Sequence, residues 1–210
     1  MIIAVDGPLA AGKGTIAKAL ARHYGLPHMD TGKLYRSVAY RLLALGKSPD
    51  DIVSATQIAH GLSLDGIEDH NLRTAQVGAA ASVVAVHPSV RQALYDLQRG
   101  FALQPGGAVL DGRDIGTVVC PEADVKLFVS ASSEERAGRR LQELLAQGEA
   151  ISYADMLAQT LERDARDSGR VDAPLRPAED AHLLDTTGLS IEAAVDKARL
   201  IVDHIRLAKS

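Results

Sequence analysis

A glycine-rich stretch near the start of the chain constrains its fold more than any other feature. The stretch follows an apolar run, Ile2–Val5, and leads into an apparent helix, Lys13–Tyr24. A strand, a glycine-rich turn, and then a lysine and a hydroxyl at a helix start are the context of a phosphate-binding P-loop. The glycines let backbone N–H groups approach phosphate oxygens, and the helix N-terminus adds partial positive charge. The predicted loop comprises Gly7, Pro8, Leu9, Ala10, Ala11, Gly12, Lys13, Gly14 and Thr15.

Two side chains of the loop have expected chemical roles. Lys13 is expected to reach the β- and γ-phosphates of a nucleotide, and the Thr15 hydroxyl to help hold Mg²⁺. The usual motif places Ser or Thr directly after the lysine, whereas Gly14 intervenes in this chain. The alternative interpretation is a glycine-rich turn that binds no ligand.

The length and composition favour an ordinary globular enzyme. The chain has 210 residues, of which 46% are hydrophobic and 24% charged, and this suits one α/β domain. A net charge of −4 gives no overall reason to bind nucleic acid or an acidic membrane, so any anion site must be local. Cys120 is the single cysteine, and we expect it to be structural and half-buried. No basic leader or membrane-length apolar run is present, so we expect a cytoplasmic protein.

Short apolar strands alternate with helices along the chain. This order predicts a parallel sheet covered by helices on both faces. Residues 61–71 are polar and weakly patterned, and we expect a surface insertion there. The predicted strands are 2–5, 26–29, 108–110, 125–129 and 183–184, and the predicted helices are 13–24, 34–46, a short one from 48, 74–86, 88–101, 132–147, one from 152, and 190–205.

Polar turns follow three of the predicted strands. The P-loop follows the first strand, Asp30–Gly32 follows the second, and Asp111–Asp114 follows 108–110, which we expect to be the central strand. Ligands of such sheets bind outside the carboxyl ends of the strands, so the three turns should meet at one site. Asp111 resembles the aspartate that helps to position Mg²⁺ in P-loop enzymes.

Arginines on two predicted helices suggest a second part of the site. Phosphoryl transfer depends on positioning and charge neutralisation, and arginine binds phosphate oxygens with two parallel hydrogen bonds. Solvated charged faces are the alternative interpretation. Together the helices suggest a mobile lid that closes over a nucleotide. Arg113 and Asp114 could simply pair with each other or could hold a substrate, and no histidine is assigned a catalytic role. The arginine-bearing sets are Arg163, Arg166, Asp167 and Arg170 on the later helix and Arg136, Arg139 and Arg140 on the earlier one.

Several segments together resemble the bacterial cytidylate (CMP/dCMP) kinases, which are P-loop nucleoside monophosphate kinases. The likeness runs over almost the whole chain in the same order, and D-G-R-D-I-G-T-V-V and E-R-D-A-R-D are its most specific parts. The segments are Gly7–Thr15, Asp30–Arg36, Asp111–Val119, Ser132–Arg136, Glu162–Asp167 and Leu184–Thr187.

The resemblance implies a three-layer α/β/α fold with a parallel sheet, a short NMP-binding insertion and a helical lid. Residues 1–210 would form a single kinase domain. Its core would be about 1–30, 104–132 and 182–210, its NMP-binding region about 31–103, and its lid about 133–172. The family commonly has a longer insertion with strands of its own, whereas residues 61–71 look abbreviated.

The resemblance also implies an activity and a set of site residues. ATP with Mg²⁺ would phosphorylate CMP and dCMP to CDP and dCDP, and the enzyme would be a monomer without nucleic-acid or membrane partners. Thr31 stands where serine is common, and its hydroxyl is kept. By family position, Lys13, Arg113 and Arg170 would be catalytic, and the P-loop with Arg139 and Arg140 would bind ATP. Thr15, with Asp111 as a second candidate, would face the metal.

The resemblance also implies how the acceptor nucleotide is bound. Arg36, Arg113 and Arg170 would hold its phosphate, and Arg163 and Asp167 would contact its sugar. Ser82, Arg91 and Asp114 would read cytosine, and Thr31 and Tyr35 would complete the substrate site.

Other interpretations remain open from the sequence. The chain could be another small-acceptor P-loop kinase of the adenylate, uridylate or shikimate type. It could instead be a nucleotide-dependent switch, although the Asn-Lys-x-Asp motif of GTPases is absent. A structural α/β domain with no ligand would leave the arginines unexplained.

Overall fold

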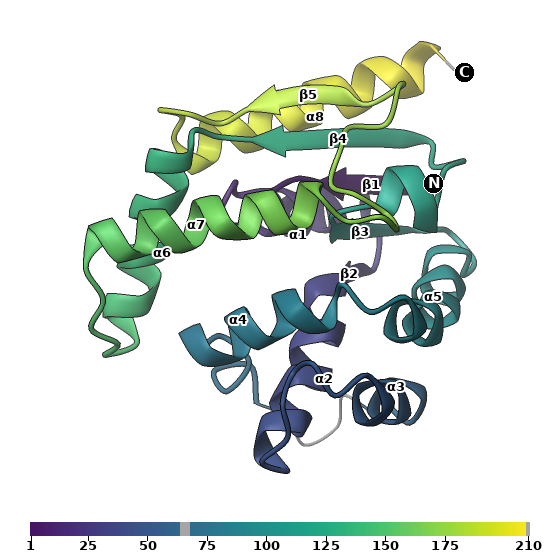
Figure 1. Ribbon diagram of the computed structural model, residues 1–210. Coiled ribbons are helices and arrows are strands. Elements are labelled where there is room, and N and C mark those ends of the chain that lie inside the picture. The colour runs from purple at the N-terminus through teal and green to yellow at the C-terminus, as the bar shows by residue number, and fades with distance from the viewer. Residues whose placement is uncertain (64–67, 209–210) are drawn as a thin grey trace.

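Strand β1 (Ile2–Asp6) lies in the middle of a parallel sheet (Figure 1). The computed structural model describes residues 1–63 and 68–208, and in these the five strands have the order β2–β3–β1–β4–β5. The other strands are β2 (His28–Asp30), β3 (Ala108–Gly112), β4 (Val125–Ser130) and β5 (His182–Asp185), and the helices are α1 (Lys13–Tyr24), α2 (Thr31–Ala44), α3 (Ile52–His60), α4 (Ala75–Val84), α5 (Pro88–Ala102), the π-helix η1 (Ile115–Val119), α6 (Ser133–Ala146), α7 (Tyr153–Ser168) and α8 (Ile191–Ala208).

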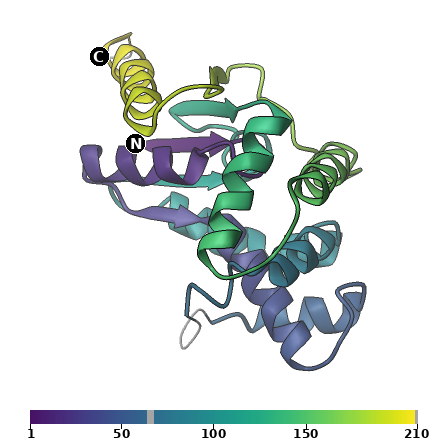
Figure 2. The same ribbon diagram turned by 90° about the vertical axis from the view of Figure 1, so that its left-hand side faces the viewer.

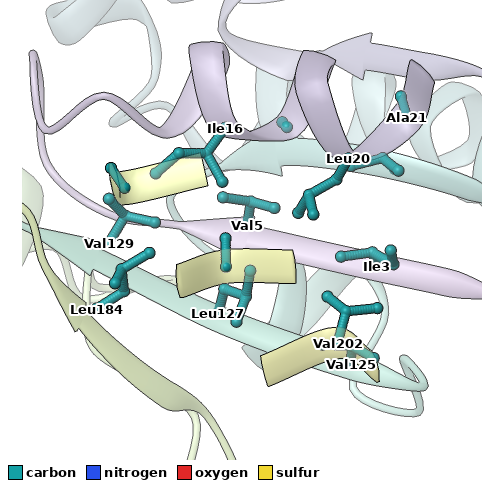
Figure 3. Close-up of a cluster of buried hydrophobic side chains, with 14 of the residues drawn as sticks. Ile3, Val5, Ile16, Leu20, Ala21, Val125, Leu127, Val129, Leu184 and Val202 are labelled. Atoms are coloured by element: carbon teal, nitrogen blue, oxygen red, sulfur yellow. The ribbon is translucent and has the colours of Figure 1, made fainter. Parts of the chain in front are cut away.

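The α/β fold with helices on both faces of a parallel sheet is therefore confirmed. Side chains alternate between the two faces along β1, as the pleat requires. Ile3 and Val5 pack under Ile16 and Leu20 of α1, with α8 completing this layer (Figure 3). On the opposite face, Ala4 belongs to a buried cluster that includes residues of β3, η1 and the end of α5. Figure 2 shows α1 and α8 on one side of the strands and α7 on the other.

Two helical groups extend beyond the sheet. Helices α2–α5 contribute to a second core that contains Leu34, Val84 and Leu94. A smaller cluster, with Leu144 and Met156, joins α6 to α7. The strand arrows point toward α6, so this pair of helices stands at the carboxyl edge of the sheet (Figure 1).

Several sequence expectations are corrected in detail. The middle strand is β1, not residues 108–110, because β3 lies between β1 and β2. The second strand begins at His28 rather than residue 26, since the Leu26 N–H closes the turn after α1 and Pro27 has no N–H to donate. Cys120 is fully buried, not half-buried. The π-helix η1 was not anticipated, and residues 64–67 of the predicted insertion lie outside the described residues.

Local capping explains why most helices begin where the sequence predicts. The Asp30 side chain accepts a hydrogen bond from the Lys33 N–H at 3.2 Å, and Ser132 caps α6 by accepting from the Glu135 N–H at 3.2 Å. Each bond satisfies one of the N–H groups that have no partner inside a helix. Among the described residues, no helix is long and apolar enough to cross a membrane.

Gly7 fixes the path from β1 into the P-loop. Its φ is +152°, and a Cβ at this position would lie 2.0 Å from the Val129 carbonyl oxygen. The P-loop therefore packs directly on the backbone of β4. Gly25, after α1, also has a positive φ of +66°, but a Cβ there would meet no atom within 4 Å.

We predict that Gly7→Ala is far more damaging than Gly25→Ala. Gly7→Ala should destabilise the protein by about 3 kcal/mol or more, because the clash is with backbone that cannot turn away. Gly25→Ala should cost only about 1 kcal/mol, the strain of a left-handed alanine. Urea unfolding of both variants measures the difference, and equal losses would contradict the proposed close contact.

Candidate active site

The three predicted polar turns meet at the carboxyl edge of the sheet, where they line a cavity of about 280 Å³. Helices α4, α6 and α7 close its outer side. Of the residues predicted to form the site, six do not line the cavity: Gly7, Pro8, Ala11, Arg136, Arg139 and Arg166. Those that do are Leu9, Ala10, Gly12, Lys13, Gly14, Thr15, Thr31, Tyr35, Arg36, Ser82, Arg91, Asp111, Arg113, Asp114, Arg140, Arg163, Asp167 and Arg170.

The P-loop presents the free start of α1 to this cavity. Ala10 and Gly12 have left-handed φ values of 58° and 89°, and no side chain caps the helix. The Lys13 ammonium group donates to the Pro8 carbonyl at 3.0 Å. Burial, to which the charge of Arg113 adds, lowers the pKa of Lys13 to about 7. A phosphate bound here would favour the protonated lysine and receive hydrogen bonds from the loop.

Asp167 on α7 lies among three arginines. Its carboxylate accepts from Arg113 Nε at 2.9 Å and from Arg170, and Arg163 Nε is 3.9 Å away. Burial alone would raise the pKa of Asp167, but Arg113, Arg170 and Arg163 outweigh it and lower the pKa to about 2. The Asp167 side chain is only 1% exposed, so this face of α7 is not a solvated charged surface.

The arginines carry more positive charge than the carboxylates near them can balance. Burial, with repulsion from Arg113, lowers the pKa of Arg163 to about 9. Arg36 pairs with Asp30 at 2.7 Å. Arg36, Arg113, Arg163 and Arg170 all line the cavity, so this part of it suits an anionic ligand.

A second polar group lies on the α5 side. Asp114 pairs with Arg91, whose guanidinium lies over the Tyr35 ring at 5.9 Å from its centroid. Burial raises the pKa of the Asp114 carboxyl, although Arg91 and Arg170 oppose the rise. Arg113 and Asp114 therefore do not pair with each other, because each turns to a different helix. The Ser82 hydroxyl accepts from Arg166 Nη1 at 3.1 Å.

Asp111 occupies the floor of the cavity beside the P-loop. Its Oδ1 lies 2.7 Å from His28 Nε2, and its carbonyl accepts from the Thr31 hydroxyl at 2.8 Å. Its Oδ2 would lie 3.7 Å from a Cβ placed at Gly14, an ordinary van der Waals distance, so the carboxylate lies beside the start of α1. Together with the Thr15 hydroxyl, these oxygens suit Mg²⁺. Among residues 1–63 and 68–208, no cluster of three or more His, Cys, Asp or Glu could hold a metal.

The lid arginines take different positions. Arg139 donates to the Thr186 hydroxyl at 3.1 Å and to its carbonyl at 2.9 Å, and Thr186 in turn donates to the Ala11 carbonyl. Arg139 therefore braces the P-loop from outside the cavity. Arg140 reaches the cavity and donates to the Arg73 carbonyl at 2.9 Å. Arg136, which is buried, binds Asp164 through both terminal nitrogens.

Sequence reasoning missed several charged or ionisable groups at this edge. Lys18, His28, Arg73 and Glu143 line the cavity, and Asp6 lies buried at the end of β1. Burial raises the pKa of Asp6 to about 7, whereas hydrogen bonds from Gly116 and Ile115 oppose the rise. The signal for Asp6 was a carboxylate at the end of an apolar strand, directly before the first glycine of the P-loop.

Comparison with known proteins places this site in a family. A sequence model described as Cytidylate kinase matches residues 3–204. The cytidylate kinase of Methylocella silvestris is 55% identical over 203 residues, which cover 97% of this chain and 94% of that protein. The cytidylate kinase of Brucella suis biovar 1 is also 55% identical, with coverage of 97% and 93%.

The chain belongs to the cytidylate kinase family. It is therefore a nucleoside monophosphate kinase, a transferase, and not a nucleotide-dependent switch or a structural domain. The resemblance inferred from the sequence is confirmed.

Solved structures share the fold of this cytidylate kinase family member. An uncharacterized protein from Eubacterium ventriosum has a TM-score of 0.56 at 12% identity, covering 98% of each chain. A gluconokinase from Sinorhizobium meliloti has a TM-score of 0.51 at 15% identity, covering 99% of this chain and 93% of its own. At these identities the likeness shows the fold alone.

We predict that Asp167→Asn destabilises the protein in a pH-dependent way. The depressed pKa of Asp167 contributes about 2 kcal/mol to stability above pH 4, because the unfolded carboxyl binds protons more readily. This contribution should shrink as the pH falls from about 4 toward 2. Urea unfolding between pH 7 and pH 3 measures the difference in free energy of unfolding between parent and variant.

Glu162→Gln on the same helix is the matched control. Glu162 is 68% exposed and pairs with Arg166 at the surface, so its loss should change stability little at every pH. If the stability difference between the parent and Asp167→Asn stays constant down to pH 3, the proposed pairing of the Asp167 charge with its three arginines is contradicted.

Proposed function

We propose that the protein transfers the γ-phosphoryl group of ATP to CMP and dCMP, giving CDP and dCDP. The observation that carries this proposal is one cavity lined both by the P-loop and by several arginines from other elements. Two phosphate groups could meet between them. Family membership supports phosphorylation of cytidylate nucleotides; the ATP donor and the acceptance of dCMP are the proposal's own.

The Asp114–Arg91 pair suits a cytosine base. Cytosine presents an amino donor beside a ring nitrogen and a carbonyl that accept hydrogen bonds. Asp114 can accept from the amino group, while Arg91 and Ser82 can bond the other positions of the base edge. Uracil would place a carbonyl against the Asp114 carboxylate, and a buried site rejects such a mismatch strongly.

The arginines suit the acceptor phosphate and sugar. Arg36, Arg113 and Arg170 line the same cavity and would hold the phosphate through charge-assisted hydrogen bonds. Arg163 and Asp167, one turn apart on α7, would contact the sugar hydroxyls. Tyr35 supports the Arg91 guanidinium, and Thr31 holds the Asp111 backbone.

The P-loop, Lys13 and Arg140 would hold ATP, with Arg139 keeping the loop in place. A bound Mg²⁺ would supply charge neutralisation on the phosphate oxygens, and Thr15 and Asp111 would hold it. No side chain need act as a strong base, because an acceptor phosphate oxygen is already nucleophilic. Lys13 and the arginines would act by stabilising the charge of the transferring group.

We also propose that a single domain contains three working parts. Residues 31–103 would bind the monophosphate, residues 133–172 would form a lid, and the remainder would form the core. Arg163 on α7 donates to the Gly78 carbonyl at 3.1 Å, so the proposed lid already contacts α4. Closure would exclude water from the transferred phosphate. The enzyme would work in the cytoplasm as a monomer.

A coupled phosphotransfer assay with Mg·ATP tests this proposal. The acceptors are CMP, dCMP, UMP, AMP, GMP and shikimate. Turnover should be confined mainly to CMP and dCMP. Preference for any other acceptor would overturn the cytosine assignment, and failure with every acceptor would overturn the proposed reaction.

We predict that Asp114→Asn relaxes the choice of base. The amide can donate to a uracil carbonyl, so the ratio of kcat/KM for CMP to that for UMP should fall by about tenfold or more. Asp69→Asn, the same change in an exposed carboxylate paired with Lys33, serves as the control. An unchanged ratio for Asp114→Asn would show that Asp114 does not read the base.

We predict that Lys13→Ala lowers kcat by about a hundredfold or more, because a charge-stabilising donor is removed from the transferring group. The variant should stay folded, since the lysine contacts one backbone carbonyl and is otherwise directed to the cavity. Lys33→Ala controls for loss of a surface lysine. A kcat for Lys13→Ala close to that of the parent, with a native circular dichroism spectrum, would refute this role.

A further inference from the structure

Asp6 binds the loop that carries Asp114, although the two residues are far apart in the sequence. Asp6 ends β1 directly before Gly7 of the P-loop and is 5% exposed. Its Oδ1 accepts from the Ile115 N–H at 2.8 Å, and its Oδ2 accepts from the Gly116 N–H at 2.7 Å. One buried carboxylate therefore uses both oxygens on two successive backbone amides.

These two amides belong to the first residues of η1. The first N–H groups of a helix have no partner within it, and the side chain at the N-cap position usually accepts from one of them. In η1 that position is occupied by Asp114, whose side chain makes no capping bond and pairs with Arg91 instead. Asp6 at the end of β1 therefore accepts the hydrogen bonds that the side chain at the N-cap position, Asp114, would normally accept.

The surroundings of η1 are built for this contact. A Cβ at Gly116 would lie 3.4 Å from Asp6 Oδ2 and 3.1 Å from Lys126 Cδ, so glycine allows the backbone to approach closely. The Val119 N–H bonds the Asp114 carbonyl at 3.1 Å, which fixes the wide turn that follows Asp114. Such π-turns frequently occur at functional sites.

We propose that Asp6 is a positioning residue for nucleotide selection, because by capping η1 it leaves the Asp114 carboxylate free to face Arg91 and the base. This inference rests on the proposed function, in which Asp114 reads cytosine. Without the Asp6 carboxylate, Asp114 is the adjacent acceptor for the exposed amides and turns toward them. Because Asp6 directly precedes the P-loop, the same residue also ties the base-reading loop to the phosphate-binding loop.

The variant Asp6→Asn tests this role with almost no change of shape. Its amide replaces one acceptor oxygen by a donor that faces a backbone N–H. The ratio of kcat/KM for CMP to that for UMP should fall about tenfold, mainly through a higher KM for CMP. The KM for ATP should stay within about twofold of the parent value, because the close packing of Gly7 is untouched.

Asp124→Asn is the matched control. Asp124 Oδ2 accepts from the Ile2 N–H at 2.7 Å, which is the same kind of bond at the opposite end of β1. This control should keep the parent selectivity whatever its effect on stability. If Asp6→Asn also keeps the parent selectivity, the positioning role is overturned and Asp6 is only structural.

Amide hydrogen exchange gives a readout that needs no substrate. The Ile115 and Gly116 amides should be protected in the parent and should exchange faster in Asp6→Asn. If that variant does not fold, Asp6→Ser replaces it in both measurements, because its shorter side chain removes the carboxylate without placing an amide donor against the two N–H groups. Fast exchange of these amides in the parent would overturn the cap even if CMP proves to be the substrate. A parent that does not use CMP, but protects both amides, would instead overturn the proposed function.

Discussion

The Asp167 carboxylate, held among three guanidinium groups, is the interaction on which the rest of the site depends. A lone buried charge is very costly, whereas arginines gathered around one carboxylate are partly neutralised and fixed in position. Lys13, Arg36, Arg113, Arg163 and Arg170 line the same cavity, so the single Asp167 carboxylate balances only part of their positive charge. The cavity is thus arranged for an anion before one binds, which reduces the reorganisation needed at the moment of reaction.

The parallel sheet determines which groups meet. Its strands all point to one edge, so the loops after β1, β2 and β3 deliver a lysine, a hydroxyl and carboxylates to the same cavity. Close backbone contacts then set the positions of these loops. Gly7 packs against the Val129 carbonyl, and the Asp6 carboxylate holds the start of η1. The phosphate-binding and proposed base-reading loops are consequently joined by direct contacts at one edge of the sheet.

Local patterns made much of this structure predictable from sequence. The P-loop, the capping residues and the strand–helix alternation each depend on neighbours within a few residues. The choice of distant partners was not predictable, because it depends on how the elements are placed in space. Arg113 pairs with Asp167 rather than adjacent Asp114, and Asp6 bonds amides more than a hundred residues away. The π-helix was missed because its sequence, I-G-T-V-V, has no distinctive helical period.

The proposed reaction requires one cavity to place a cytidine monophosphate between the arginines and the P-loop. A crystal structure with CMP and a non-hydrolysable ATP analogue tests it most directly. We expect the acceptor phosphate within hydrogen-bond distance of Arg36, Arg113 and Arg170, and the cytosine amino group on Asp114. A base bound away from Asp114, or an acceptor phosphate that touches none of these arginines, would contradict it.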